Sequence, residues 1–307
     1  MDRAPTSSGA RRLRPEIVIL ILLVLAVAAA WVSVYRAGSR TLTVTFFNVG
    51  QGDSALIQAP SGRALLIDGG GEGHDYSGSS DVGERVIVPG MMVRGVKRLN
   101  GIVVTHGDDD HVNGLDRVVD QVPVEMVLDP LLPHPAAPYE RLRALEEEHG
   151  IPVFKARLGQ QFNFGKGIKA MVLHPGLVPI WGTAADANNN SAVLRLVYGK
   201  VSFLFAGDIE TEGERQLLAR DLALRGTVLK VPHHGADAEA MPDFIRAVRP
   251  ELAVISVGPD NPYGHPSPRV VERLRAAGAK VMRTDLAGAI TVTTDGRSWR
   301  AAAYRRN

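Results

Sequence analysis

The sequence contains no cysteine. This absence excludes disulfide bonds, thiolate metal ligands, a cysteine nucleophile and a lipid-modified cysteine near the N-terminus. It does not decide the compartment, because secreted proteins can also fold without disulfides. The sequence also lacks low-complexity tracts, short repeats and a strong excess of either charge, since its net charge is only +2.

That small net charge conceals an uneven distribution. Residues 1–40 hold six arginines against two acids, which leaves residues 41–307 with a net charge of about −2. A weakly acidic body is not a general polyanion-binding surface. If this part of the chain acts on nucleic acid, the contacts must be local and assisted by metal ions.

One long apolar run lies near the N-terminus. It extends without a charge over residues 17–35, and three arginines precede it at close range while two follow it. That length is just enough for a helix to cross a bilayer. By the positive-inside rule, we expect a cytoplasmic basic tail over residues 1–16, a membrane anchor over 17–35, a linker over 36–41 and an extracytoplasmic remainder.

Two other interpretations of this run stay open. The alanines of "AVAAA" offer cleavage sites for a signal peptide, in which case the remainder is secreted. A buried core helix is the other interpretation, and the one-sided charge flanks disfavour it. We favour an uncleaved anchor because the apolar run continues past those alanines.

Residues 42–305 alternate between short apolar runs and turns. The runs "LTVTFF", "SALIQAP" and "RALLIDGG" predict a β-meander, and "NGIVVTH" predicts a buried strand. A second series of strands comprises "IKAMVLHP", "SAVLRLVYG", "VSFLFAGD", "TVLKVPHHG", "LAVISVG", "KVMRT", "GAITVTTDG" and "RSWRAAAY". These two β-rich halves predict two sheets packed face to face with helices outside.

Five segments are predicted to be helices inserted between these strands. They are "GLDRVVDQV", "PYERLRALEEEHG", "IETEGERQLLARDLALRG", "MPDFIRAVRP" and "SPRVVERLRAAG". The segment "GERVIVPGMMVRGV" is expected to be a helical connector. Histidines and aspartates recur where strands end, and loops at such ends commonly carry binding and catalytic groups.

The segment "VVTHGDDDHVNG" concentrates acids and imidazoles at a strand exit. His106 and Asp108 can point the same way from an extended loop, whereas Asp110 and His111 begin the next helix and point elsewhere. One short segment can therefore serve two neighbouring metal ions. The alternative is a solvated acidic loop in which Asp110 caps the helix.

Two further strand exits carry candidate ligands. Asp208 ends "FLFAGD", where it could bridge two cations or cap the following helix. His233 and His234 end "KVPHHG" as candidate metal ligands, against a purely structural imidazole. Lys230, just before them, could contact a phosphate or simply be exposed.

The histidines of the sequence fall into two groups. Five lie in Gly-, Asp- or Pro-rich segments at strand exits: His106, His111, His233, His234 and His265. The other four are expected to be ordinary surface residues: His74, His134, His149 and His174.

The motifs "THGDDDHVNG", "AGD" and "VPHHG", in that order, resemble the metallo-β-lactamase superfamily. Together with "VTFFNVGQGDSALIQAPSGRALLIDGG", "NPYGHPSP" and "RTDLAGAI", they are most similar to the C-terminal domain of ComEC-type DNA-internalisation proteins. This resemblance covers nearly all of residues 42–305. It implies an αββα sandwich hydrolase domain with two divalent metal ions, Zn²⁺ or Mn²⁺, at one edge.

The resemblance also implies roles for individual residues. His106, Asp108, Asp110 and His111 would take the places of the superfamily's first ligand motif. Asp208 would be the bridging carboxylate, and one histidine of "HHG" would complete the second site.

Two departures from the superfamily pattern affect the expected metal centre. A further histidine of the superfamily is replaced by "NNNS", where Asn190 or Ser191 is the nearest counterpart. Asp108 stands where most members have histidine, and this hard oxygen ligand shifts the preference toward Mn²⁺. Zn²⁺ also accepts carboxylates.

The predicted chemistry is phosphodiester hydrolysis by a water that two cations activate. Asp110 and Asp208 are assigned to the catalytic centre. Asp53 and Asp68 are expected to brace the loops or add ligands, with ordinary turn chemistry as the alternative.

The loop "NPYGHPSP" is the predicted substrate side of the centre. Asn261, Tyr263 and His265, with Lys230, are expected to contact substrate, and His265 could protonate the leaving group. The alternative is a rigid turn in which Ser267 caps the next helix.

DNA outside the cytoplasmic membrane is the first substrate expected, and another phosphodiester on a lipid or cell-wall headgroup is the second. Two alternatives from other functional classes stay open. One is a β-lactam or thioester hydrolase, and the other is a metal-free, membrane-tethered binding module. ComEC-type proteins also carry a multi-helix channel, whereas this chain has one possible span. A role in DNA uptake would therefore need a separate channel protein.

Overall fold

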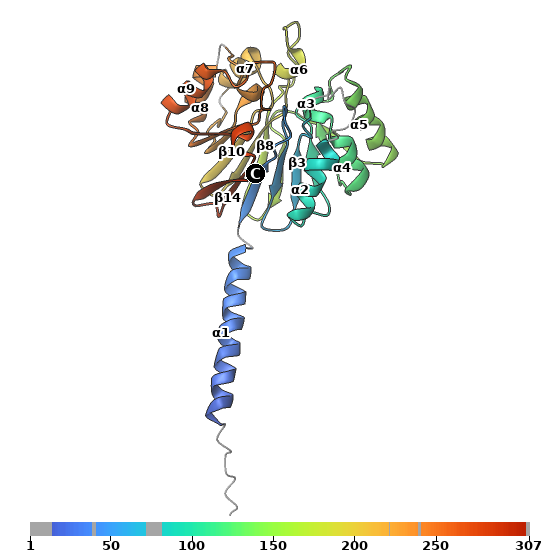
Figure 1. The fold of residues 1–307 in the computed structure, drawn as a ribbon. Helices are drawn as coiled ribbons and strands as arrows, with labels where there is room; N and C mark the ends of the chain where they lie inside the picture. The colour runs from blue at the N-terminus through green and yellow to red at the C-terminus, as the bar shows by residue number, and fades with distance from the viewer. Residues whose placement is uncertain (1–13, 39–40, 72–81, 221, 239–240, 305–307) are drawn as a thin grey trace, which may run out of the picture. The chain divides into compact units, whose positions relative to one another are not determined.

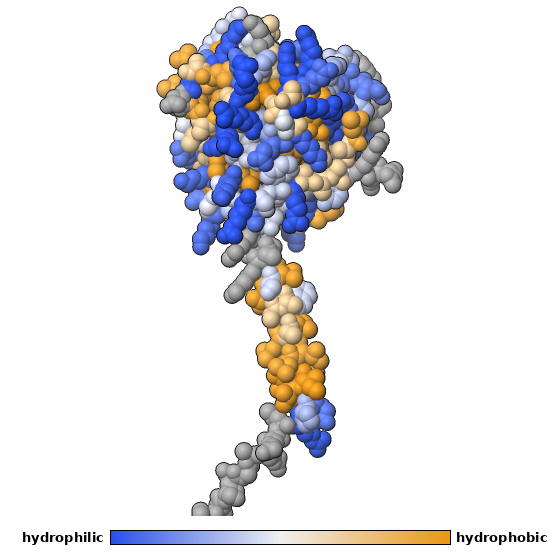
Figure 2. Space-filling view, turned by 90° about the vertical axis from the view of Figure 1, so that its left-hand side faces the viewer, coloured by the Kyte–Doolittle hydropathy of each residue, from blue (hydrophilic) through white to orange (hydrophobic). Residues whose placement is uncertain are grey.

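The computed structural model describes residues 14–38, 41–71, 82–220, 222–238 and 241–304. The chain divides into two compact units, Met1–Arg40 and Thr41–Asn307. The described part of the first unit is mainly one helix, α1 (Pro15–Gly38). Its stretch Pro15–Val34 has a mean hydropathy of 3.1 and is unburied, as the orange surface of α1 in Figure 2 shows. A helix of this length and composition can span a membrane or act as a signal sequence.

One sheet of the second unit has eight strands in the order β15-β14-β1-β2-β3-β4-β5-β6. Its strands are β1 (Leu42–Phe46), β2 (Ala55–Gln58), β3 (Ala64–Ile67), β4 (Gly101–Val103), β5 (Val127–Asp129), β6 (Val153–Lys155), β14 (Ala289–Thr294) and β15 (Trp299–Tyr304). The pairs from β3 to β6 are parallel. The remaining pairs are antiparallel.

The other sheet has seven strands in the order β13-β12-β11-β10-β9-β8-β7. Its strands are β7 (Gln161–Gly165), β8 (Ile168–His174), β9 (Val193–Tyr198), β10 (Val201–Phe205), β11 (Val228–Lys230), β12 (Leu252–Ile255) and β13 (Lys280–Arg283). The pairs from β10 to β13 are parallel. The pairs from β7 to β10 are antiparallel.

Helices cover the outer side of each sheet, as Figure 1 shows. Those beside the first sheet are η1 (Gly83–Ile87), α2 (Val88–Val93), α3 (Asp109–Val112), α4 (Leu115–Gln121) and α5 (Ala137–Glu148). Those beside the second sheet are α7 (Thr211–Leu218), α8 (Met241–Val248) and α9 (Pro268–Ala276). The short elements α6 (Asp186–Asn189), η2 (Pro232–Gly235) and α10 (Thr284–Ala287) lie in connections.

The alternation of side chains along each central strand explains this layering. In β10, Phe203 and Phe205 join the apolar cluster between the sheets, while Leu204 joins the cluster beneath the helices. In β4, Val103 and Ile102 divide in the same way. Because successive strand residues face opposite sides, a strand that is apolar throughout must be covered on both sides. The expected αββα sandwich is confirmed.

Three expectations from the sequence need correction. The sheets do not follow the two halves of the chain, because β14 pairs with β1 and brings the C-terminus into the first sheet. The helix expected over 209–226 ends at Leu218 as α7, because the chain must return to place Leu224 in the core beside β11. Strands β5, β6 and β7 were not predicted. β5 is a short buried strand, and most residues of β6 and β7 are half-buried or exposed.

The parallel strands bring their carboxyl ends to one edge of the sandwich. Residues that follow β3, β4 and β5 in one sheet therefore meet residues that follow β10, β11 and β12 in the other. Loops at this edge can carry functional side chains that the strands hold in place.

Candidate metal centre

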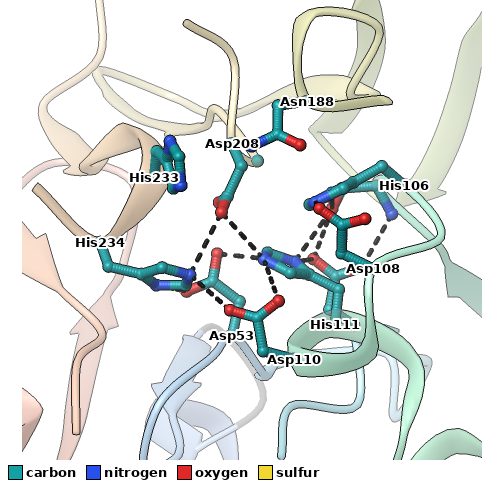
Figure 3. Close-up of polar contacts among 12 residues, drawn as sticks. Asp53, His106, Asp108, Asp110, His111, Asn188, Asp208, His233 and His234 are labelled. Carbon is teal, nitrogen blue, oxygen red and sulfur yellow. Dashed lines mark hydrogen bonds and ion pairs between the residues drawn. The ribbon is translucent and has the colours of Figure 1, made fainter. Parts of the chain in front are cut away.

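Four side chains from three strand exits form the larger of two groups of candidate ligands in the described chain. Asp110 and His111 lie in α3 after β4, Asp208 follows β10, and His234 follows β11. One ligand atom from each lies within 4.8 Å of all the others. His111 Nε2 and His234 Nε2 lie 3.2 and 3.1 Å from Asp208 Oδ2, as Figure 3 shows.

A hydrogen bond at Nδ1 fixes the orientation of the His111 and His234 imidazoles. His111 Nδ1 lies 2.9 Å from Asp68 Oδ2, and His234 Nδ1 lies 2.9 Å from the carbonyl oxygen of Ser256. Since these oxygens accept a hydrogen bond, each Nδ1 carries the proton and each Nε2 faces the centre. A carboxylate or carbonyl behind a histidine in this way is typical of metal-binding imidazoles.

The centre requires a cation. His234 Nε2 lies 2.9 Å from Asp110 Oδ2, and two lone pairs at that distance repel each other unless a proton or a metal ion lies between them. Burial disfavours the charged imidazole, but the Asp208 and Asp110 carboxylates raise the pKa of His234 to about 10. Burial also opposes charge on His111, whose pKa Asp208 and Asp68 nevertheless raise well above its usual value. The described residues therefore fit a metal ion.

Asp68 and Asp53 support the centre from within. Asp68 is 1% exposed and accepts hydrogen bonds from the backbone N–H and the hydroxyl of Thr105, each 2.8 Å long. Asp53 pairs with the ammonium of Lys230. Their buried contacts suit the bracing role expected for both acids. Residues that served only as ordinary turn formers would be more exposed.

Lys230 does not face a substrate. Its side chain is 4% exposed, and Nζ lies between Asp53 and Asp208, 3.3 Å from Asp208 Oδ1. Burial alone would lower its pKa, but the Asp53 and Asp208 carboxylates raise it. The expected phosphate contact is therefore replaced by a buried ion pair that fixes two carboxylates.

His106 and Asp108 form a second, more open part of the centre. Their Nε2 and Oδ2 atoms are 3.2 Å apart, and the Asp108 side chain is about one-third exposed. His106 Nδ1 faces the hydroxyls of Thr105 at 3.1 Å and Ser191 at 3.4 Å. His106 Nε2 is buried without a hydrogen bond among the described residues, so a ligand atom faces the centre here too.

Neither candidate for the absent histidine supplies a free ligand. The Asn190 side chain is used by the backbone, because it bonds Ile180 N and O and the carbonyl of Asp186. Ser191 Oγ accepts a hydrogen bond from the backbone N–H of Asp208, 3.1 Å away. Ser191 thus orients Asp208 and His106.

The two adjacent histidines have different surroundings. Both adopt positive φ angles, 42° for His233 and 51° for His234, so the backbone turns sharply between β11 and the following loop. His234 enters the centre, whereas His233 Nδ1 lies 3.1 Å from Glu210 Oε1. Figure 3 shows His233 without a contact to the central carboxylates. The geometry favours His234 as the ligand.

The loop "NPYGHPSP" forms an aromatic border beside His233. The His265 ring lies 5.5 Å from the His233 ring and 5.9 Å from the Tyr263 ring. Burial and the neighbouring imidazoles of His233 and His234 lower the pKa of His265. Asn261 does not face a substrate, because its amide bonds His265 N and O and the Gly258 carbonyl.

Two of the histidines expected at the surface are not there. His174 is fully buried, and its Nε2 lies 2.8 Å from the carbonyl of Asn189, while burial lowers its pKa to about 4. His134 Nε2 lies 2.6 Å from Asp108 Oδ1. No sequence signal singled out His134, because the strand that precedes it, β5, was itself not predicted. His149 is half-exposed beside Asp120, and His74 lies outside the described residues.

Comparison with known proteins identifies relatives for most of the chain. It is 30% identical over 269 residues to ComE operon protein 3 of Bacillus subtilis (strain 168), which covers 84% of this chain and 34% of that protein. It is 33% identical over 250 residues to Competence protein ComA of Neisseria gonorrhoeae, which covers 80% and 31%. The chain thus spans about a third of the length of these relatives.

Among solved structures, a putative metal-dependent hydrolase from Parabacteroides distasonis ATCC 8503 aligns with a TM-score of 0.47 and 15% identity, over 80% of this chain and 93% of that chain. A diphosphatase from the PhnP family aligns with a TM-score of 0.45 and 14% identity, over 86% and 100%. The family model of the metallo-beta-lactamase superfamily matches residues 47–258. Because that match covers more than half of the chain and includes the candidate ligands from His106 to His234, the chain belongs to the metallo-beta-lactamase superfamily.

Proposed function

We propose that this metal-dependent hydrolase cleaves phosphodiester bonds, with nucleic acid outside the cytoplasmic membrane as its substrate. The observation that carries the proposal is the charge of the centre. Five carboxylates stand against a single ammonium, that of Lys230: Asp53, Asp68, Asp108, Asp110 and Asp208. The excess of four negative charges matches two divalent cations, and such a pair suits an anionic phosphodiester.

Asp110, His111, Asp208 and His234 would hold one cation, and His106 and Asp108 would begin the site of the other. Asp208 would lie between them. The mixture of imidazole and carboxylate ligands suits Zn²⁺ or Mn²⁺, and the extra oxygen ligand of Asp108 favours Mn²⁺. When bound, the cation pair would polarise the phosphoryl oxygens and lower the pKa of an attacking water toward about 7.

The protein's own residues prepare this reaction. Lys230 holds Asp53 and Asp208 in place in the interior, because its ammonium lies against both carboxylates. Asp68 and Ser256 hold the rings of His111 and His234 in place. His265 and the exposed Tyr263 border the centre, where His265 could bind a phosphate oxygen or carry a proton to the leaving group.

The relatives favour nucleic acid over the other substrates. One relative is named Competence protein ComA and another ComE operon protein 3, and competence is the uptake of DNA. A β-lactam or thioester hydrolase, in contrast, would act on a substrate that is not strongly anionic. A metal-free binding module is disfavoured by the arrangement of the rings, since Asp68 and Ser256 hold the Nε2 atoms of His111 and His234 toward the carboxylates in the way typical of metal-binding imidazoles. We propose α1 as an uncleaved anchor, with the hydrolase domain outside and any channel supplied by a separate protein.

The experiment uses full-length protein in detergent, stripped of metal and reloaded with Mn²⁺, Mg²⁺ or Zn²⁺. Substrates are single- and double-stranded DNA, bis(p-nitrophenyl) phosphate, a chromogenic β-lactam and a thioester. We expect metal-dependent DNA cleavage that Asp208→Asn lowers by at least about 10³-fold, because it removes the charge shared between the cations. The matched control is Asp120→Asn at an exposed carboxylate, which should retain activity.

Three results would contradict the proposal. Equal cleavage by Asp208→Asn and the native chain would place the activity elsewhere. Turnover of the β-lactam or thioester without cleavage of any phosphodiester would reassign the substrate class. Failure of the native chain to bind a divalent ion would exclude metal-dependent hydrolysis.

A further inference from the structure

His134 makes a specific contact with the open side of the metal centre. It lies in the loop between β5 and α5, 26 positions after Asp108, and its Nε2 lies 2.6 Å from Asp108 Oδ1. The other Asp108 oxygen, Oδ2, lies 3.2 Å from His106 Nε2. The two oxygens of one carboxylate thus face two different imidazoles.

The backbone identifies which nitrogen of His134 carries the proton. The N–H of Ala136 donates a hydrogen bond to His134 Nδ1 over 3.2 Å. A nitrogen that accepts a hydrogen bond has its lone pair in the ring plane, so in the neutral imidazole the proton is on Nε2. His134 therefore donates to Asp108 and has no lone pair left for a metal ion on that side.

Packing holds the His134 ring in this position. A Cβ atom at Gly107 would lie 2.7 Å from His134 Cγ, so the ring lies directly against the backbone of the ligand segment. Its edge meets the Tyr139 ring at a centroid distance of 6.1 Å. The Tyr139 hydroxyl in turn donates to Asp129 Oδ1 over 3.1 Å. The donor is therefore fixed before any ligand binds.

This contact makes the two halves of the centre unequal. Because Asp108 Oδ1 is occupied by His134, only Oδ2 remains for a cation beside His106. Within the described residues, His106 and Asp108 belong to no group of three or more ligands as compact as Asp110, His111, Asp208 and His234. A cation at His106 and Asp108 would have fewer protein ligands and more positions open to water or phosphate oxygens.

We propose that His134 is a positioning residue that holds Asp108 as a one-oxygen ligand, and that the centre thereby binds one cation tightly and a second weakly. The tight site is built by Asp110, His111, Asp208 and His234, and the weak site by His106 and Asp108. This inference rests on the proposed metal centre but not on the identity of the substrate. The open site lacks the histidine that the superfamily has near Asn190 and Ser191, and His134 instead stabilises this site by holding Asp108.

The test compares two substitutions of similar size. His134→Leu fills the same space without a donor, and His134→Gln restores an N–H that can reach Asp108. Metal-free full-length protein in detergent is titrated with Mn²⁺ by calorimetry and by electron paramagnetic resonance. We expect two classes of site in the native chain. In His134→Leu the weak class should lose about 10- to 100-fold in affinity, the usual cost of removing such support, and the tight class should change less than about twofold.

The controls separate positioning from packing. His134→Gln should recover most of the weak-site affinity, and His149→Leu, at a partly exposed histidine, should change neither class. Equal loss in both His134 variants would show that an N–H donor at this position does not restore the weak site, and would overturn the proposal. Unchanged weak-site affinity in His134→Leu would also overturn it, as would a single class of site in the native chain.

Failure of the proposed function would look different. A chain that shows both classes of Mn²⁺ site and the expected response to His134→Leu, but cleaves no DNA, would leave the role of His134 intact and exclude the substrate. Circular dichroism of each metal-free variant identifies misfolding. If His134→Leu does not fold, the folded His134→Gln variant is compared with the native chain. A native-like weak-site affinity then supports the proposal, and a weak-site affinity far below the native value overturns it.

Discussion

At the scale of single residues, the structure uses buried polar groups in two ways. At the sheet edge, Lys230 lies between two carboxylates, and Asp68 is hydrogen-bonded on both oxygens. Glu214 in α7 is different, because it is fully buried and neither carboxyl oxygen has a hydrogen bond among the described residues. An unpaired buried acid opposes folding wherever it must ionise.

Glu214 predicts a pH dependence of stability. Burial, with a smaller effect of Glu210, raises the pKa of Glu214 from its usual 4.5 to about 8. The folded state therefore keeps a proton that the unfolded state releases, and the free energy of unfolding should fall as the pH rises from about 4.5 to 8. Glu214→Leu should remove this decline and stabilise the protein at pH 8 by about 1–3 kcal/mol.

Denaturation monitored by circular dichroism between pH 5 and pH 8 measures this effect. Glu272→Leu, at an exposed position of α9, is the control for adding an apolar residue. If Glu214→Leu and the native chain show the same change of stability with pH, the carboxyl group is not protonated in the folded state.

Part of the centre could be predicted at this scale and part could not. His106, Asp208 and His234 could be predicted as candidate ligands, because each follows an apolar strand in a segment where acids or imidazoles are visible in the sequence. The choice of His234 over His233 depends on the positive-φ turn that aims their side chains differently. The contact of His134 with Asp108 depends on the conformation of a loop, which no periodicity encodes.

At the scale of elements, the central strands connect the core to the centre. β10 carries Phe203 and Phe205 inward, with ring centroids 6.3 Å apart, and ends three residues before Asp208. The Phe205 ring also lies 6.0 Å from that of Phe46 in β1. Apolar packing between the sheets therefore fixes the strand end from which Asp208 extends.

Phe203→Ala should lower the free energy of unfolding by about 3–5 kcal/mol, because it leaves a cavity between the sheets. Phe154→Ala, in β6, removes a ring that is 50% exposed and should cost less than about 1 kcal/mol. Chemical denaturation compares the two variants. Equal costs would mean that β10 does not anchor the core.

The strand assignments show where element prediction succeeds and fails. β9, β10 and β11 are apolar runs bounded by turns, and they were expected from the sequence. β6 and β7 alternate irregularly and are partly exposed, so hydrophobic periodicity gives little signal for them. The partner of a strand is a further unknown, since the pairing of β14 with β1 joins segments about 250 residues apart.

At the scale of the whole molecule, charge and apolarity are segregated along the chain. Basic residues precede α1, whose surface is apolar, and the remainder carries a small negative charge. This order fits the proposed anchor, because positive charges are retained on the cytoplasmic side. It also means that the hydrolase domain attracts cations rather than polyanions in general.

Protease treatment of intact spheroplasts tests the proposed topology. Tags at the two ends should respond differently: a C-terminal tag should be removed, and an N-terminal tag should stay protected until the membrane is broken. Mass spectrometry of the purified protein should show α1 still attached. Protection of both tags would place the domain in the cytoplasm, and loss of α1 would favour the secreted form.

The pairing of β14 with β1 has a consequence for biosynthesis. The first strand of the domain leaves the ribosome about 250 residues before its neighbour on one side, Ala289–Thr294. The eight-stranded sheet therefore stays incomplete until that later strand is made. Late closure of the sheet suits a domain that is to be threaded across a lipid barrier before it folds.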